Sequence, residues 1–159
     1  MGEVKDVLLI LPCVLKQGDR SLLNYALSEA GISPGSMTEE YICYNLAYTV
    51  KSARANRDIL EKRLRDREAK VIVPFGEAFQ ALCGLSPIMK WRGMMVSPDE
   101  CRRPHLGKVE VDLVLPPFAQ VILPTISPAT VRKNPGVGLR YWHYDMARLR
   151  RAIDGKLAA

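Results

Sequence analysis

The stretch Leu123–Pro135, LPTISPATVRKNP, joins a predicted strand to a predicted helix. The apolar run Gln120–Leu123 has strand propensity, and Pro124 ends it because proline has no N–H to give to a sheet. Ser127 followed by Pro128 is the pattern of a helix N-cap with proline at the first helical position. We therefore expect a strand end, a turn and a helix start within these residues.

The same stretch predicts an anion site at the start of that helix. The backbone N–H groups of Ala129 and Thr130 would point outward from the helix N-terminus, where unpaired N–H groups attract anions. Arg132 and Lys133 follow within one turn and add positive charge that suits a phosphate. A strand-to-helix connection without any functional role has a similar composition, and this alternative stays open.

The rest of the chain alternates between strand and helix patterns. Val7–Leu11 is a continuous apolar run, typical of a central strand buried on both faces, and Lys70–Pro74 is predicted to be a short buried strand. Weaker strand patterns cover Tyr41–Tyr48 and Val109–Leu115, the latter with Glu110 and Asp112 facing outward. Apolar spacing predicts helices between Ser21 and Gly31, over Ser52–Glu68, from Phe75 to Leu82 and around Trp142–Ile153. These patterns predict a single α/β domain over residues 1–159.

The charge of the chain is concentrated near its end. Lys and Arg number 23 against 17 Asp and Glu, a net charge of +6. From Ser127 onward, seven basic residues stand against two acidic ones, so five of the six excess charges lie there. This asymmetry favours a polyanionic partner, although an exposed basic helix face without a specific partner is the alternative.

The cysteines and the N-terminus predict an intracellular protein. Cys13, Cys43, Cys83 and Cys101 include no C-x-x-C pair, so we expect reduced thiols and neither a zinc ribbon nor a disulfide scaffold. The apolar run that ends at Pro12 is too short to span a membrane and lacks a small-residue cleavage site. We therefore expect a cytoplasmic protein that does not enter a membrane.

Six motifs, taken in order, resemble the uracil-DNA glycosylase superfamily. They are NLAYT (45–49), NRD (56–58), KVIVPFGEAFQALCG (70–84), KWRG (90–93), LPTISPATVRKNP (123–135) and YWHYDMARLRRAI (141–153). The likeness is nearest to the iron–sulfur branch, family 4, and to related phage polymerase-associated proteins. It implies a three-layer α/β/α sandwich with a central, mainly parallel sheet and a DNA-facing groove at the carboxyl ends of the strands.

The resemblance also implies roles for particular residues. Asn45 matches the asparagine that reads a base flipped out of the DNA stack, and an amide is apt because it donates and accepts at once. A strand residue bonded to neighbouring backbone is the alternative for Asn45. The segment at Ser127 matches the loop that enters the minor groove, and the segment at Lys90 matches a further loop near DNA. The implied DNA-binding residues are Lys90, Arg92, Gly93, Ser127, Pro128, Ala129, Thr130, Arg132 and Lys133.

The sequence departs from the family at its catalytic and cluster positions. Ser127 stands where the family has a histidine, and the glycine-rich loop with its water-handling residue is missing after the first strand. Asp19 is the only nearby carboxylate, and it lies later than that motif. Thr49 stands where the third cluster cysteine would be, and the other cluster cysteines have no match. We therefore predict no iron–sulfur cluster, no other metal and no cofactor.

Three functions stay open at this point. The first is a catalytically degenerate DNA-binding protein of this fold, acting in phage or bacterial replication, repair or modified-base recognition, with a replication or repair protein as a further partner. The second is an active base-excision glycosylase for uracil or a modified base, with Asp19, Ser127 and Asn45 as relocated catalytic groups. The third is a protein-interaction module. Loss at several independent positions favours binding over chemistry, and whether the protein is an enzyme stays open.

Overall fold

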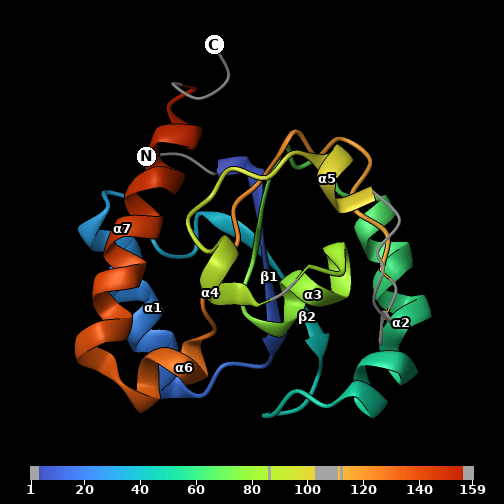
Figure 1. Cartoon of the computed structure of the whole chain (residues 1–159), viewed down its shortest axis with the longest axis horizontal. Helices are drawn as coiled ribbons and strands as arrows, with labels where there is room; N and C mark the ends of the chain where they lie inside the picture. Colours follow the sequence, from blue (N-terminus) through green and yellow to red (C-terminus); the bar gives the residue numbers. More distant parts are fainter. Residues whose placement is uncertain (1–3, 86, 103–110, 112, 156–159) are drawn as a thin grey trace.

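The fold is built on a four-stranded parallel sheet with strand order β2-β1-β3-β4 (Figure 1). The structure is a computed structural model that describes residues 4–85, 87–102, 111 and 113–155. The strands are β1 (Val4–Cys13), β2 (Met37–Cys43), β3 (Val71–Pro74) and β4 (Val121–Ile122). The predicted α/β fold with a mainly parallel sheet is confirmed. The three-layer order implied by the resemblance and the single domain over 1–159 stay predictions.

The central strand β1 separates two apolar cores. Leu8 and Ile10 point into one core, whereas Val7, Leu9 and Leu11 point into the other, and all five are almost completely buried. Successive side chains of a strand point to opposite faces, so a continuous apolar run has to be covered on both sides. The prediction that Val7–Leu11 is a central strand is therefore confirmed.

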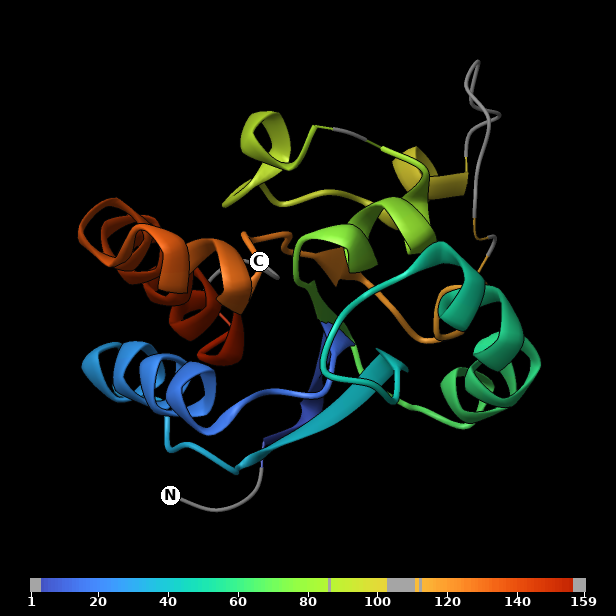
Figure 2. The ribbon, with the colours of Figure 1, turned by 90° about the horizontal axis from the view of Figure 1, so that it is seen from below.

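Helices cover both faces of this sheet (Figure 1). The first core includes residues of α2 (Val50–Arg65) and α3 (Glu77–Cys83). The second includes residues of α1 (Gln17–Glu29), α6 (Pro128–Lys133) and α7 (Pro135–Ile153). Two short helices, α4 (Ile88–Trp91) and α5 (Pro98–Arg102), lie between β3 and β4 in the chain. Because all four strands run the same way, their carboxyl ends meet at one edge, which Figure 2 shows from below.

Several element boundaries differ from the sequence prediction, and three of them bear on the candidate site. Helix α1 begins at Gln17, so Ser21 is not its cap. Helix α2 begins at Val50 because the Thr49 hydroxyl accepts a hydrogen bond from the Ser52 N–H at 3.1 Å. Strand β2 ends at Cys43, which pairs with Cys13. Strand β1 also ends there, so β2 has no strand to pair with beyond this point. Asn45 therefore lies in a loop and not in a strand.

The predicted strand Val109–Leu115 lies partly outside the described residues, as do Glu110 and Asp112. Of the described positions, Val111, Leu113 and Leu115 are buried in the first core but belong to no strand. Partial alternation there reflects contact with the core rather than sheet pairing.

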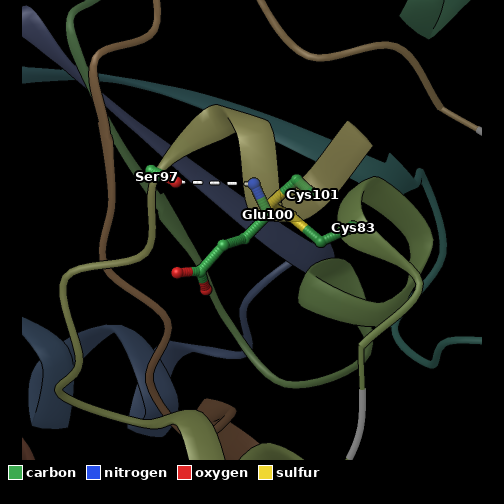
Figure 3. Close-up of a disulfide and its surroundings, with 4 residues drawn as sticks. All are labelled: Cys83, Ser97, Glu100 and Cys101. Carbon is green, nitrogen blue, oxygen red and sulfur yellow. Dashed lines mark hydrogen bonds between the residues drawn. A yellow bond between two sulfur atoms is a disulfide. The ribbon is translucent and has the colours of Figure 1, made fainter. Parts of the chain in front are cut away.

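The structure corrects the prediction of reduced thiols for two cysteines. Cys83 at the end of α3 and Cys101 in α5 form a disulfide, with their Cα atoms 4.2 Å apart (Figure 3). At the start of α5, the Glu100 N–H donates to the Ser97 hydroxyl at 3.4 Å. The two cysteines are 18 residues apart, and no local pattern shows that α3 and α5 pack together. Cys13 and Cys43 keep free thiols.

Candidate nucleic-acid interface at the carboxyl edge of the sheet

The loops that follow the strands are tied to one another at the carboxyl edge. The Val14 N–H donates to the Asn45 carbonyl at 2.9 Å, which joins the loops after β1 and β2. The Gly76 N–H donates to the Thr125 carbonyl at 2.8 Å, which joins the turns after β3 and β4. The segments that contain Asp19, Asn45 and Ser127 therefore share one edge of the sheet (Figure 2).

Ser127 caps helix α6, as predicted. Its hydroxyl oxygen accepts from the Thr130 N–H at 3.2 Å and lies 2.9 Å from the Thr130 hydroxyl oxygen. The residue is only 6% exposed, because the turn at Gly76 packs directly against it. Gly76 has φ +54°, and a Cβ atom there would lie 2.7 Å from the Ser127 Cβ. The Ser127 hydroxyl is thus engaged in the local structure.

Asp19 pairs with Arg132 of the predicted DNA-binding segment. The Arg132 Nη1 donates to the Asp19 Oδ2 at 3.1 Å, which links α1 to α6. Asp19 is 5% exposed, and its Oδ1 is buried with no hydrogen-bond partner in the part of the chain that the structure describes. The Arg132 side chain keeps 41% exposure. The Arg132 guanidinium is therefore paired with a buried carboxylate and is still accessible to solvent.

Glu77 is a carboxylate at this edge that the sequence analysis missed. Burial raises the pKa of the Cys13 thiol, and the charges of Glu77 and Asp19 raise it further, whereas Arg132 lowers it. Burial also raises the pKa of Cys43, again with a contribution from Glu77. Glu77 is exposed at the start of α3. Because its charge acts on both thiols, it lies within electrostatic range of Cys13 at the end of β1 and of Cys43 at the end of β2. The strand, glycine and helix sequence at Gly76 was the signal that could have pointed to it.

Asn45 is exposed in the loop after β2. Its Nδ2 donates to the Ser52 hydroxyl at 3.0 Å. Among the described residues, it makes no hydrogen bond to Asp19 or Ser127. The three predicted catalytic residues thus lie at one edge without forming one constellation.

The loop at Lys90 is held against α7. The Arg92 Nη1 donates to the Asp145 Oδ1 at 2.6 Å, and the Arg92 Cζ lies 4.1 Å from the centroid of the Tyr141 ring. The Gly93 carbonyl accepts from Arg148 at 3.2 Å. Arg92 and Gly93 therefore have intramolecular contacts, whereas Lys90 stays exposed.

Asp145 is the buried centre of that contact. It is fully buried, and its Oδ2 accepts from the Thr125 hydroxyl at 2.6 Å. Burial raises the pKa of Asp145 above its ordinary value, although the bonds from Thr125 and Arg92 oppose this rise. The carboxylate joins α7 both to the turn after β4 and to the residue that follows α4.

Exposed lysines lie on the segments that follow β1, β2 and β4. Lys16 precedes α1, Lys51 lies in the first turn of α2 and Lys133 ends α6, and all three are exposed. Over the described ranges, no group of three or more His, Cys, Asp or Glu is arranged to hold a metal ion. None of the described helices combines the length and apolar character needed to cross a membrane.

Comparisons with known proteins leave the family open. No protein-family model matches this chain, and neither does any curated protein. The structure defines an α/β protein with a parallel sheet and with exposed lysines on the segments that follow three of its strands. The likeness to the glycosylase superfamily rests on the six sequence motifs.

Proposed function

We propose that this protein binds DNA at the carboxyl edge of its sheet and has little or no glycosylase activity. The observation that carries the proposal is that Lys16, Lys51 and Lys133 are exposed on the segments that follow the carboxyl ends of β1, β2 and β4. Cations gathered on one surface neutralise backbone phosphates and release counterions, which supplies affinity without a sequence preference. The order of the six motifs supports the same edge as the DNA-facing one.

The contacts of the predicted catalytic residues support the loss of glycosylase activity. Ser127 has no imidazole, and its hydroxyl is occupied at the start of α6. Asp19 is buried and paired with Arg132. A general base has to reach the proton that it removes, whereas the Ser127 hydroxyl and the Asp19 carboxylate are engaged in contacts within the protein.

One observation favours base excision as the second candidate function. The buried Asp19 Oδ1 lacks a partner among the described residues, and a buried acceptor without a partner is costly to keep. A water molecule held there would satisfy it, and base excision needs a water molecule beside a carboxylate. Robust excision that is lost in Asp19→Asn would establish this candidate.

A cellular role follows from the first proposal. DNA binding without strong chemistry fits an accessory protein of replication, repair or modified-base recognition in a bacterial or phage-infected cell, with a replication or repair protein as a further partner. We place it in the cytoplasm of that cell. The Cys83–Cys101 disulfide is unusual for such a compartment.

The test is a salt series on fluorescein-labelled DNA. Affinity should fall as salt rises, with a slope of about 0.9 per phosphate contact on a log–log plot for duplex. Lys16→Ala/Lys133→Ala should flatten this slope by about two contacts. Lys62→Ala/Lys70→Ala is the matched control, because it removes the same charge from two exposed lysines, one in the last turn of α2 and one just before β3. Salt-independent binding, or equal effects of the two variants, would overturn the proposal.

A further inference from the structure

The loop after β2 exposes large apolar side chains at the carboxyl edge. Residues 44–47 are all exposed, with Tyr44 at 46% and Leu46 at 62%. The two residues flank Asn45 in the sequence, in the loop between β2 and α2. Two large apolar side chains exposed in one short loop offer contact area to a ligand with apolar surface of its own.

The backbone of this loop is anchored at both ends. Near its start, the Asn45 carbonyl accepts from the Val14 N–H at 2.9 Å. Near its end, the Cys43 thiol donates to the Thr49 carbonyl at 3.6 Å, and Thr49 caps α2. Tyr44 and Leu46 are therefore presented to solvent by a loop that other contacts hold in place.

The Tyr44 ring has a defined orientation. It meets the Tyr41 ring edge to face, with centroids 6.4 Å apart and an interplanar angle of 66°. The Arg63 Cζ lies 5.3 Å from the Tyr44 centroid. With both contacts in place Tyr44 is still 46% exposed, so surface for a further contact remains.

Two further cations lie at the start of the helix that follows the loop. Lys51 and Arg54 are exposed in the first turns of α2 and lie three residues apart, on one side of the helix. The first turn of α2 contains no acidic residue. The loop and the helix start therefore combine apolar surface with positive charge.

We propose that the loop 44–49 is a stacking platform for unpaired bases, so that the protein prefers single-stranded DNA to duplex. This inference rests on the proposed function and specifies its ligand. Bases in a duplex stack on one another, whereas a single strand offers a free face of each base. Tyr44 and Leu46 would contact those faces, while Lys51 and Arg54 would contact the phosphates of the same strand.

Three labelled probes of equal length separate base contacts from phosphate contacts. They are a thymidine homopolymer, a strand made only of abasic sites, and a duplex. By fluorescence anisotropy at one salt concentration, the wild type should bind the homopolymer roughly 5- to 100-fold more tightly than the abasic strand. Tyr44→Ala/Leu46→Ala should abolish that difference and leave the affinities for the abasic strand and the duplex unchanged. Equal wild-type affinity for all three probes overturns the inference.

Two further variants serve as controls. Tyr44→Phe should keep the preference, because stacking needs the ring and not the hydroxyl. Tyr25→Ala removes another exposed tyrosine, 55% accessible on α1, and should change nothing. If the double variant misfolds by circular dichroism, Leu46→Ala alone has to lower homopolymer affinity severalfold, or the inference fails. Absence of all DNA binding refutes the proposed function, whereas equal binding to all probes refutes only the platform.

Discussion

The Arg132 Nη1 lies 3.1 Å from the Asp19 Oδ2 and thereby ties the segment after β4 to the first turn of α1. A carboxylate that pairs with an arginine weakens the electrostatic attraction between that arginine and a phosphate. Asp19 therefore opposes the DNA contact that the sequence predicts for Arg132.

Asp19→Asn should raise DNA affinity severalfold, because it removes the competing charge and nearly preserves the shape of the side chain. The salt dependence should steepen by up to about 0.9, which is one additional phosphate contact. Anisotropy titrations over a salt series measure both quantities. In Asp19→Asn/Arg132→Ala the gain should disappear, and a gain that persists there would count against the coupling.

Uracil excision should be absent or very weak. Ser127 stands where the glycosylase superfamily that the sequence resembles has a histidine, and the water-handling motif of that superfamily has no match; each such group commonly supplies on the order of 10²-fold or more in rate. Alkaline cleavage of a uracil-containing oligonucleotide after incubation measures the abasic product. Robust turnover that is abolished by Asn45→Ala would show that the chemistry has been retained.

Gly76→Ala should destabilise the protein. Its φ of +54° disfavours any side chain, and the new Cβ would lie 2.7 Å from the Ser127 Cβ. The backbone strain alone costs on the order of 1–3 kcal/mol, and the close contact adds to it. Urea denaturation gives the free energy of unfolding. Gly31→Ala is the matched control, since φ there is +77° but no atom lies within 4 Å of the new Cβ, and a loss as large at Gly31 would contradict this account.

Asp145→Ala should cost about 3–5 kcal/mol, because it leaves Arg92 and Thr125 without their shared buried acceptor. The pH dependence supplies a second measurement. Burial raises the pKa of Asp145, so the folded carboxyl holds its proton where the unfolded one has lost it. The stability of the wild type relative to Asp145→Asn should therefore fall as the pH rises from the usual carboxyl pKa through the raised one. A difference that grows with pH over this range would be the opposite of our expectation.

Reduction of the Cys83–Cys101 disulfide should lower stability by about 3 kcal/mol in the chain-entropy account, given the separation of 18 residues. Thermal unfolding with and without reductant measures the loss, and Cys83→Ala/Cys101→Ala should be insensitive to reductant. Intact mass under non-reducing conditions tests the bond directly. A wild-type mass that corresponds to four free thiols would contradict it.

Local patterns predicted much of the fold. The apolar run 7–11 and the predicted strand 70–74 form neighbouring strands, and Ser127 with Pro128 starts α6. These features could be predicted because they depend on residues that are adjacent in the chain. The end of β2 was misplaced, since it depends on where β1 stops pairing.

The contacts at the candidate site carry no such local signature. Asp19 and Arg132 are 113 residues apart, and Arg92 and Asp145 are 53 apart. The Cys83–Cys101 bond likewise depends on α3 and α5 packing together. The packing of whole elements around the sheet decides which charges pair, which hydroxyl is hydrogen-bonded and which side chains stay exposed. The residue type determines what a side chain can bind, whereas the packing determines what it can reach.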